Sequence, residues 1–296
     1  MYAITGITGK VGGELARTLL AAGEPVRAVV RDPQKGQEWA ALGCEIALAN
    51  IEDTASLTIA FRGTEGVFVL VPPNFDPAPE FPEARAIAAA LRTALEAARP
   101  ARVVYLSTIG AQASESNLLT QHTIIEATIR ELPTPITFLR PAWFMENFTW
   151  DVASARDSGV IASFLQPLGK PFPMIATVDV GRVAAELIQE DWNGCRVVEL
   201  EAAHRITPNE VAATFAKILG RPVRIAAVPR ETWGSLFKSQ GMKNPLPRIQ
   251  MLDGFNEGWI EFEREESGSM KGKVSLEMVL RGLIEAGVER RTPRMV

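Results

Sequence analysis

The chain has 296 residues, and 31 basic against 35 acidic side chains give a formal net charge of -4. This length favours two domains, or one large α/β domain with an appendage. A hydrophobic content of 47% supports a large core and excludes a disordered chain. The lack of a basic excess argues against nucleic acid as the main ligand.

Other bulk features favour a cytoplasmic protein. No run of about 18 apolar residues is present, so no membrane-spanning segment is predicted, and the first residues do not follow a signal-peptide pattern. Cys44 and Cys195 are too few and too far apart to suggest a disulfide scaffold. With two histidines in the chain, we expect no metal site.

Residues 2–4 form an apolar strand that runs into a glycine-spaced turn and then into an apolar helix. This arrangement is typical of a dinucleotide-phosphate cradle, because glycines let backbone N–H groups approach an anion and the helix start carries positive charge. The spacing is Gly-x-x-Gly-x-x-Gly, so the prediction depends on the strand before it and the helix after it. The predicted cofactor-binding residues of the turn are Gly6, Ile7, Thr8, Gly9, Lys10, Val11 and Gly12.

Strand and helix patterns alternate through the first half of the chain. Because strands that are apolar on both faces and separated by helices indicate a parallel sheet, we predict a doubly wound α/β domain over residues 1–150. The predicted strands after the first are 26–30, 45–48, 67–71, 102–106 and 136–139, and the predicted helices are 54–60, 83–98 and 117–130.

After about residue 150 the alternation weakens and prolines punctuate the chain. We predict a smaller α+β lobe over residues 151–296 that receives a substrate or partner, with some elements free to return to the main sheet. Thr207, Pro208 and Glu210 predict a capped helix start. The charged stretch after Glu263 is interpreted as a solvated hinge before a last helix over 276–286.

The end of the second strand indicates which nicotinamide cofactor binds. In this fold an arginine at that point accommodates the 2′-phosphate of NADP, whereas an acid binds the 2′-hydroxyl of NAD. Arg31 comes first and Lys35 follows, so NADP(H) is favoured over NAD(H), with Asp32 as the counterargument. Asn50, after the third strand, either contacts the adenine edge or forms a simple turn.

Ligands in doubly wound sheets lie beyond the carboxyl ends of the strands. Val71 and Pro72 end the fourth strand and Ser107 ends the fifth, so we expect these residues to line the nicotinamide side. A loop-capping role for Ser107 is equally compatible with the sequence.

These motifs together resemble the NmrA-like branch of the atypical short-chain dehydrogenases. The resemblance rests on residues 5–12, on 29–33 and on Leu-Arg-Pro-Ala-Trp-Phe-Met-Glu-Asn-Phe at 139–148. It implies either an NADPH-dependent quinone or dye reductase or a protein that binds NADP(H) as a redox sensor without turnover. It also suggests that Asn147 contacts the nicotinamide half of the cofactor. Trp143, Phe144 and Met145, after the sixth strand, either supply an apolar wall for a flat acceptor or belong to the core between the lobes.

The tyrosine–lysine relay of ordinary short-chain dehydrogenases is missing. Neither Tyr2 nor Tyr105 is followed by a lysine four residues later. His122 and Glu126 share one helix face instead, in a pattern similar to that of the reductases of the family. His122 is therefore the candidate catalytic residue, either orienting the cofactor or protonating the reduced acceptor, and a purely structural histidine is the alternative.

We thus expect an NADPH-dependent reductase that transfers hydride to quinone-like or other conjugated small molecules. The alternative is a non-catalytic, redox-sensing regulator that binds NADP(H). The expected partner is a small-molecule acceptor, with a homodimer or a regulatory protein partner as further possibilities.

Overall fold

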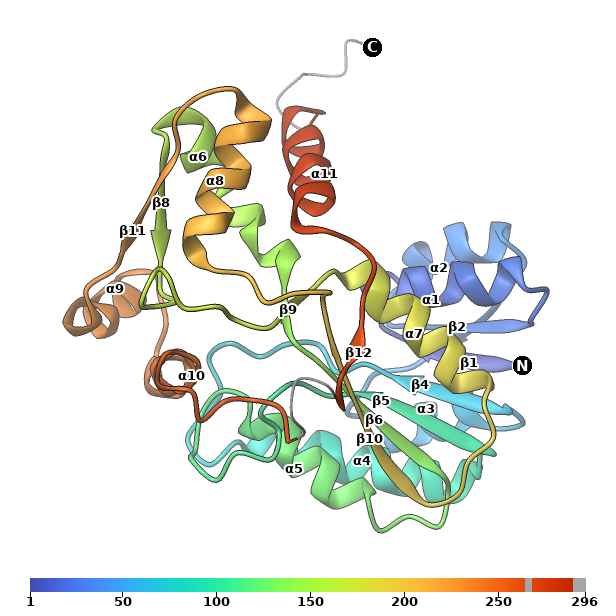
Figure 1. Ribbon diagram of the computed structural model, residues 1–296. Coiled ribbons are helices and arrows are strands. Elements are labelled where there is room, and N and C mark those ends of the chain that lie inside the picture. Colours follow the sequence, from blue (N-terminus) through green and yellow to red (C-terminus); the bar gives the residue numbers. More distant parts are fainter. Residues whose placement is uncertain (264–267, 290–296) are drawn as a thin grey trace.

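A parallel sheet of eight strands forms the centre of the computed structural model, which describes residues 1–263 and 268–289 (Figure 1). The strand order is β12-β10-β6-β5-β4-β1-β2-β3. The strands are β1 (Tyr2–Thr5), β2 (Val26–Val30), β3 (Glu45–Leu48), β4 (Gly66–Val69), β5 (Arg102–Leu106), β6 (Ile136–Pro141), β10 (Cys195–Glu201) and β12 (Met270–Lys271).

The order reverses at β1, which pairs with β2 on one side and with β4 on the other, both in parallel. The chain therefore winds outward in two directions from β1, and the predicted doubly wound fold class is confirmed. A crevice opens beyond the carboxyl ends of β1 and β4, because their helical connections leave toward opposite edges of the sheet. The glycine turn follows β1 directly and thus lies at this crevice.

Helices cover both faces of the sheet, and each face has its own apolar core (Figure 1). Successive strand residues point to opposite faces, so Ile4 joins one core and Ala3 the other. One face carries α1 (Lys10–Ala21), α2 (Pro33–Ala41) and α7 (Thr177–Gln189); the other carries α3 (Thr54–Phe61), α4 (Pro82–Ala98) and α5 (Thr120–Ile129).

The C-terminal half divides its elements between the main sheet and a separate lobe. Helix α7 packs on α1, and β10 and β12 extend the sheet beyond β6. The boundary near residue 150 stays a prediction. The remaining elements are β7 (Trp143–Phe144), α6 (Val152–Asp157), β8 (Val160–Ser163), β9 (Met174–Ile175), α8 (Pro208–Leu219), β11 (Arg224–Ala227), α9 (Trp233–Ser239), α10 (Leu246–Glu257) and α11 (Leu276–Glu289), with the 3-10 helices η1 (Met145–Trp150) and η2 (Arg230–Thr232).

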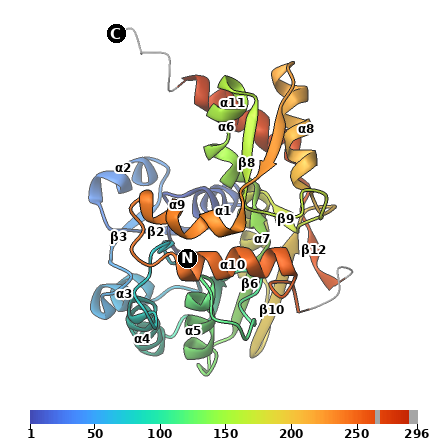
Figure 2. The same ribbon diagram turned by 90° about the vertical axis from the view of Figure 1, so that its left-hand side faces the viewer.

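Two of these helices, α9 and α10, lie beyond the carboxyl ends of the strands (Figures 1 and 2). The amide of Leu118, in the loop after β5, donates to Pro247 O near the start of α10. In the same way Asp76, in the loop after β4, accepts from the amides of Lys243 and Asn244. The lobe is thereby fastened over the edge of the sheet where a ligand would bind.

The structure corrects two predicted segments. Residues 264–267 lie outside the described residues. The chain after them is exposed at Met270 and Lys271, but these two residues pair with β10 as β12, so this stretch is part of the sheet and not a hinge. The helix expected from residue 117 begins at Thr120, because the Asn117 side chain accepts from the Leu119 amide and donates to Glu115 O in a local turn.

A close approach between α1 and α7 yields the first prediction. A Cβ atom on Gly181 would lie 2.6 Å from Glu14 Cβ and 2.8 Å from Val11 O, so the two helices meet only because residue 181 has no side chain. We expect Gly181→Ala to lower the free energy of unfolding by about 1–3 kcal/mol, the usual effect of overpacking. Urea denaturation followed by circular dichroism measures it.

Gly282→Ala is the matched control, since Gly282 is also helical but has no atom within 4 Å of its would-be Cβ. It should raise stability by about 0.5–1 kcal/mol through helix propensity. Equal effects of the two substitutions would contradict the proposed packing constraint.

Candidate functional site

The glycine turn after β1 holds the start of α1 against its own backbone. Gly6 has φ = 64°, a left-handed conformation that favours glycine. A Cβ on Gly12 would lie 2.5 Å from Gly6 O, so only glycine fits there. The Gly9 amide donates to Gly6 O at 2.9 Å, which closes the turn. The first amides of α1 thus face the crevice without intrahelical acceptors, as an anion site requires.

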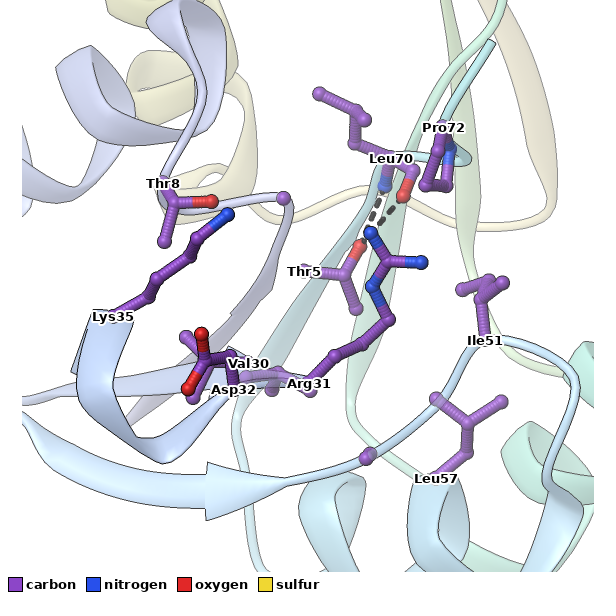
Figure 3. A pocket seen from close by; sticks show the side chains of 13 residues that line it. Thr5, Thr8, Val30, Arg31, Asp32, Lys35, Ile51, Leu57, Leu70 and Pro72 are labelled. Atoms are coloured by element: carbon purple, nitrogen blue, oxygen red, sulfur yellow. Dashed lines mark hydrogen bonds between the residues drawn. The ribbon is translucent and has the colours of Figure 1, made fainter. Parts of the chain in front are cut away.

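A cavity of ≈ 160 Å³ lies beside this turn, at the carboxyl ends of β1, β2 and β4 (Figure 3). Apolar side chains form one wall and polar side chains line the rest. The apolar members are Val29, Val30, Ala49, Ile51, Leu57, Leu70 and Pro72, and the others are Thr5, Gly6, Thr8, Arg31, Asp32 and Lys35. Thr5 Oγ1 accepts from the Leu70 amide at 2.7 Å and thereby holds the ends of β1 and β4 together.

Two cations, Arg31 and Lys35, line this cavity. Within the described part of the chain, the side chains of Arg31 and Lys35 form no ion pair or hydrogen bond, and both are exposed. In Figure 3 the Lys35 amine points toward Thr8 and the Arg31 guanidinium reaches toward the Leu70 side of the cavity. Unpaired cations over an apolar slot are suited to a nucleotide with an extra phosphate.

Asp32, the counterargument to NADP in the sequence, has a structural role. Its Oδ1 accepts from the Gln34 amide at 2.9 Å, and it is the N-cap residue of α2, with Pro33 at the first helical position. An aspartate followed by proline is a common helix start. One carboxylate oxygen is therefore already engaged by the backbone.

Not every residue named from the sequence lines this cavity. Gly6, Thr8, Arg31, Lys35 and Pro72 do. Asn50 is exposed and its amide donates to Ser56 Oγ, while its neighbours Ala49 and Ile51 form the wall. Ile7 and Val11 are buried in the core, Lys10 is exposed at the start of α1, and Val71 packs on the α3–α5 face.

The segment after β6 lies on the other side of the crevice. Phe144 and Asn147 are half-buried, and the Asn147 side chain has no hydrogen bond to any described residue. Glu146 fixes this segment, since its carboxylate accepts from the amide of Thr177 at 2.9 and 3.0 Å and from its hydroxyl at 2.6 Å. Trp143 packs edge-on against Phe255 of α10, with ring centroids 5.3 Å apart.

A buried ion pair lies beneath the crevice and was not predicted from the sequence. Arg140 of β6 is 2% exposed, and it donates from Nε and Nη2 to the two Glu126 carboxylate oxygens at 2.8 and 2.6 Å. Ser107 Oγ donates to the same carboxylate at 2.5 Å, so Ser107 supports the pair. Burial alone lowers the pKa of Arg140, but the hydrogen bonds and charges of Glu126 and Glu263 outweigh it and raise that pKa.

His122, the candidate catalytic residue, pairs with a tyrosine. Its Nδ1 lies 2.7 Å from the hydroxyl of Tyr105, which is fully buried in β5. Burial lowers the pKa of His122 to about 4, although the charge of Glu126 partly opposes the shift. The imidazole is therefore neutral at pH 7, which disfavours the predicted proton donation from an imidazolium. Any catalytic role of His122 stays a prediction.

The described residues contain neither a membrane-spanning helix nor a metal-binding cluster. None of the helices there combines the length and apolarity needed to cross a bilayer. Among residues 1–263 and 268–289, no three His, Cys, Asp or Glu side chains come together in a way that would hold a metal ion.

The strand order, the glycine turn and the cavity are those of the doubly wound class of dinucleotide-binding folds. Within that class, the NmrA-like family model matches residues 2–261, so the chain belongs to the NmrA-like family. This confirms the family resemblance drawn from the motifs.

Curated relatives include reductases. The chain is 28% identical over 249 residues to the NAD(P)H azoreductase of Xenophilus azovorans, covering 83% of each chain. It is 28% identical over 249 residues to quinone oxidoreductase 2 of Escherichia coli, covering 83% of this chain and 84% of the relative.

Solved structures share the fold. The NADPH-dependent quinone oxidoreductase QOR2 of E. coli, complexed with NADPH, matches with a TM-score of 0.80 at 24% identity, over 96% of this chain and 99% of that one. The triphenylmethane reductase of Citrobacter sp., complexed with NADP(H), matches with a TM-score of 0.78 at 21% identity, over 96% of this chain and 100% of that one.

The buried ion pair yields a stability prediction. Glu126→Gln leaves the buried Arg140 guanidinium without its main counterion, so we expect a loss of about 3–5 kcal/mol in unfolding free energy. Chemical denaturation measures it. Glu96→Gln, which removes an exposed partner of Arg92, should change stability little. A loss no larger than that of the control would contradict the structural role of the pair.

The pKa of His122 yields a pH prediction. Because its folded-state pKa of about 4 lies below the unfolded value of about 6.5, the unfolded chain takes up the proton first as the pH falls. Stability attributable to this residue is therefore present above pH 6.5 and is lost toward pH 4, by about 3 kcal/mol at most.

His122→Asn keeps an acceptor near the Nδ1 position but cannot titrate, and it is the matched variant. Relative to wild type, its stability should fall less between pH 6.5 and pH 4, as measured by urea denaturation at each pH. If the unfolding free energies of wild type and variant fall equally between pH 6.5 and pH 4, His122 is not buried in the neutral form.

Proposed function

We propose that the protein is an NADPH-dependent reductase of quinone-like or other conjugated small molecules. The observation that carries the proposal is a pair of cations, Arg31 and Lys35, which have no partner among the described residues and lie in a cavity beside the glycine turn. Membership of the NmrA-like family supports it, as do the azoreductase and quinone oxidoreductase relatives, each at 28% identity over 83% of the chain.

The residues present fit a 2′-phosphorylated dinucleotide. The missing side chain at Gly12 leaves the turn closed on Gly6 O, and the first amides of α1 remain available for a pyrophosphate. The apolar wall that includes Ile51 and Leu57 suits an adenine ring, and Arg31 and Lys35 suit the additional phosphate. Pro72, Phe144 and Asn147 are proposed to border the nicotinamide half, and Asn147 to contact it.

Bound NADPH would supply a hydride, and the protein would supply alignment and exclusion of water. Trp143 and Phe144 offer an apolar wall suited to a flat acceptor, held in place by α10 through the contact of Trp143 with Phe255. Because quinone reduction requires no tyrosine–lysine relay, the absence of that relay is compatible with turnover. The same cofactor site would also serve a regulator that binds NADP(H) without turnover.

Anaerobic loss of NADPH absorbance in the presence of a panel of small quinones distinguishes the reductase from the regulator. We expect oxidation that depends on both acceptor and enzyme and that far exceeds the enzyme-free rate. Tight NADPH binding without turnover of any acceptor in the panel would overturn the reductase proposal and favour the regulator.

The preference for NADPH yields its own prediction. Arg31→Ala and Lys35→Ala should each raise the Kd for NADPH by about 10- to 100-fold, since each removes a charge-assisted phosphate contact worth about 1.5–3 kcal/mol. The Kd for NADH should change little. Titration calorimetry measures both.

Arg281→Ala removes an exposed arginine of α11, which pairs with Glu277, and serves as the control for net charge. It should leave both affinities unchanged. If Arg31→Ala and Arg281→Ala give the same NADPH affinity, Arg31 does not bind the 2′-phosphate.

A further inference from the structure

The hydrogen bond between Tyr105 and His122 has a defined donor and a defined acceptor. Tyr105 is fully buried, and its hydroxyl has no hydrogen-bond partner other than His122 Nδ1 among the described residues. A buried hydroxyl that donates to nothing is costly, so Tyr105 must donate its proton to Nδ1. Burial, together with the charge of Glu126, raises the pKa of Tyr105 well above 10, so the hydroxyl keeps its proton at neutral pH.

An accepting Nδ1 places the hydrogen of the neutral imidazole on Nε2. Glu126, one turn further along α5, does not accept this hydrogen. Its carboxylate receives hydrogen bonds from Ser107 and Arg140 instead. Nε2 has no hydrogen-bond partner in the described part of the chain. Among the described residues, three side-chain atoms are both unpartnered and sealed from solvent, namely Glu83 Oε2, Trp143 Nε1 and Trp192 Nε1. Nε2 of His122 is not one of them, and His122 is only half-buried. Solvent therefore reaches Nε2.

From these contacts we infer that Tyr105 is a positioning residue, which fixes His122 as the Nε2–H tautomer so that this N–H donates a hydrogen bond to an oxygen of the bound acceptor. The inference rests on the proposed reductase function. His122 lies in the first turn of α5. Its neighbour Gln121 donates from Nε2 to Asn74 O at 2.9 Å, so this turn lies against the loop that follows β4. This is the carboxyl edge of the sheet, where ligands of doubly wound folds bind.

A neutral imidazole in this tautomer is suited to stabilising an oxyanion. If bound NADPH supplied one hydride, that is one hydrogen with two electrons, to a quinone, negative charge would develop on the quinone oxygen and water would supply the proton that completes the hydroquinone. A donor fixed in advance stabilises that charge without giving up its own proton. Tyr105 itself cannot reach the acceptor, because its side chain is sealed within the core.

Nitrogen NMR of protein labelled with ¹⁵N-histidine tests the inference directly. The chain has two histidines, and His204 is exposed on the other lobe, so a His204→Gln variant assigns the spectrum. At pH 7 we expect His122 to show a protonated Nε2 and an unprotonated Nδ1. Tyr105→Phe should release a mixture of tautomers. Tyr2→Phe, at the far end of the sheet, should change nothing. An Nδ1–H tautomer or an imidazolium in wild type would overturn the inference.

Adding NADP⁺ and 2-methyl-1,4-naphthoquinone, which together cannot react, tests the contact. The Nε2–H proton should shift downfield and exchange more slowly with water. An unchanged signal at saturating concentrations of both would overturn the inference even if the enzyme turns over. If no acceptor is reduced at all, the proposed function fails, and the tautomer and this shift still decide the present inference.

Kinetics provide a second readout. Tyr105→Phe should lower kcat and kcat/KM together by about 3- to 10-fold, the effect of one neutral hydrogen bond, with KM nearly unchanged. His122→Asn should lower both by on the order of 10²-fold, as for loss of an oxyanion donor. Wild-type kinetics in both variants, confirmed as folded by circular dichroism, would contradict the inference.

Discussion

The contact between Gly12 and the carbonyl oxygen of Gly6 is the constraint on which the rest of the site depends. A Cβ on Gly12 would lie 2.5 Å from that oxygen, so α1 starts where it does only because residue 12 has no side chain. The position of α1 sets that of α7, which packs on it through Gly181. The cavity that Arg31 and Lys35 line lies beside the same turn, with Gly6 and Thr8 in its wall. Thus one backbone approach organises both a face of the sheet and the proposed phosphate site.

Buried polar contacts organise the other side of the crevice. Arg140 links β6 to α5 through Glu126, and to the segment after α10 through Glu263 at 2.6 Å. Because this charge is buried, its partners have little freedom to move without a large energetic cost. The same helix carries His122, so the ion pair also helps to fix the position of the Tyr105–His122 pair. Stability and the proposed chemistry are therefore coupled through α5.

Features that depend on local sequence were largely predictable. Glycine spacing identified the turn, apolar runs identified the central strands, and the cap at Thr207 forms as the sequence predicted. Strand β12 was missed because two residues carry no periodicity. Asp32 was ambiguous because an acid after the second strand is compatible with two roles, and the hydrogen bond to the Gln34 amide shows that it caps α2.

Long-range pairs were not predictable from one sequence. Tyr105 was set aside because no lysine follows it four residues later, yet its partner is His122, 17 residues along the chain on a neighbouring helix. An arginine within an otherwise apolar strand signals a buried partner, but the sequence does not show which acid it will be. The cavity likewise combines residues from several strand ends, and only their common edge could be predicted.

We propose that this edge of the sheet binds a 2′-phosphorylated nucleotide. Calorimetry with 2′,5′-ADP and with 5′-AMP tests it most directly, because the two fragments differ only in the phosphate that Arg31 and Lys35 are proposed to bind. We predict that 2′,5′-ADP binds at least about 10-fold more tightly and that added salt reduces the difference. Equal affinities at low salt would contradict the assignment of the cavity.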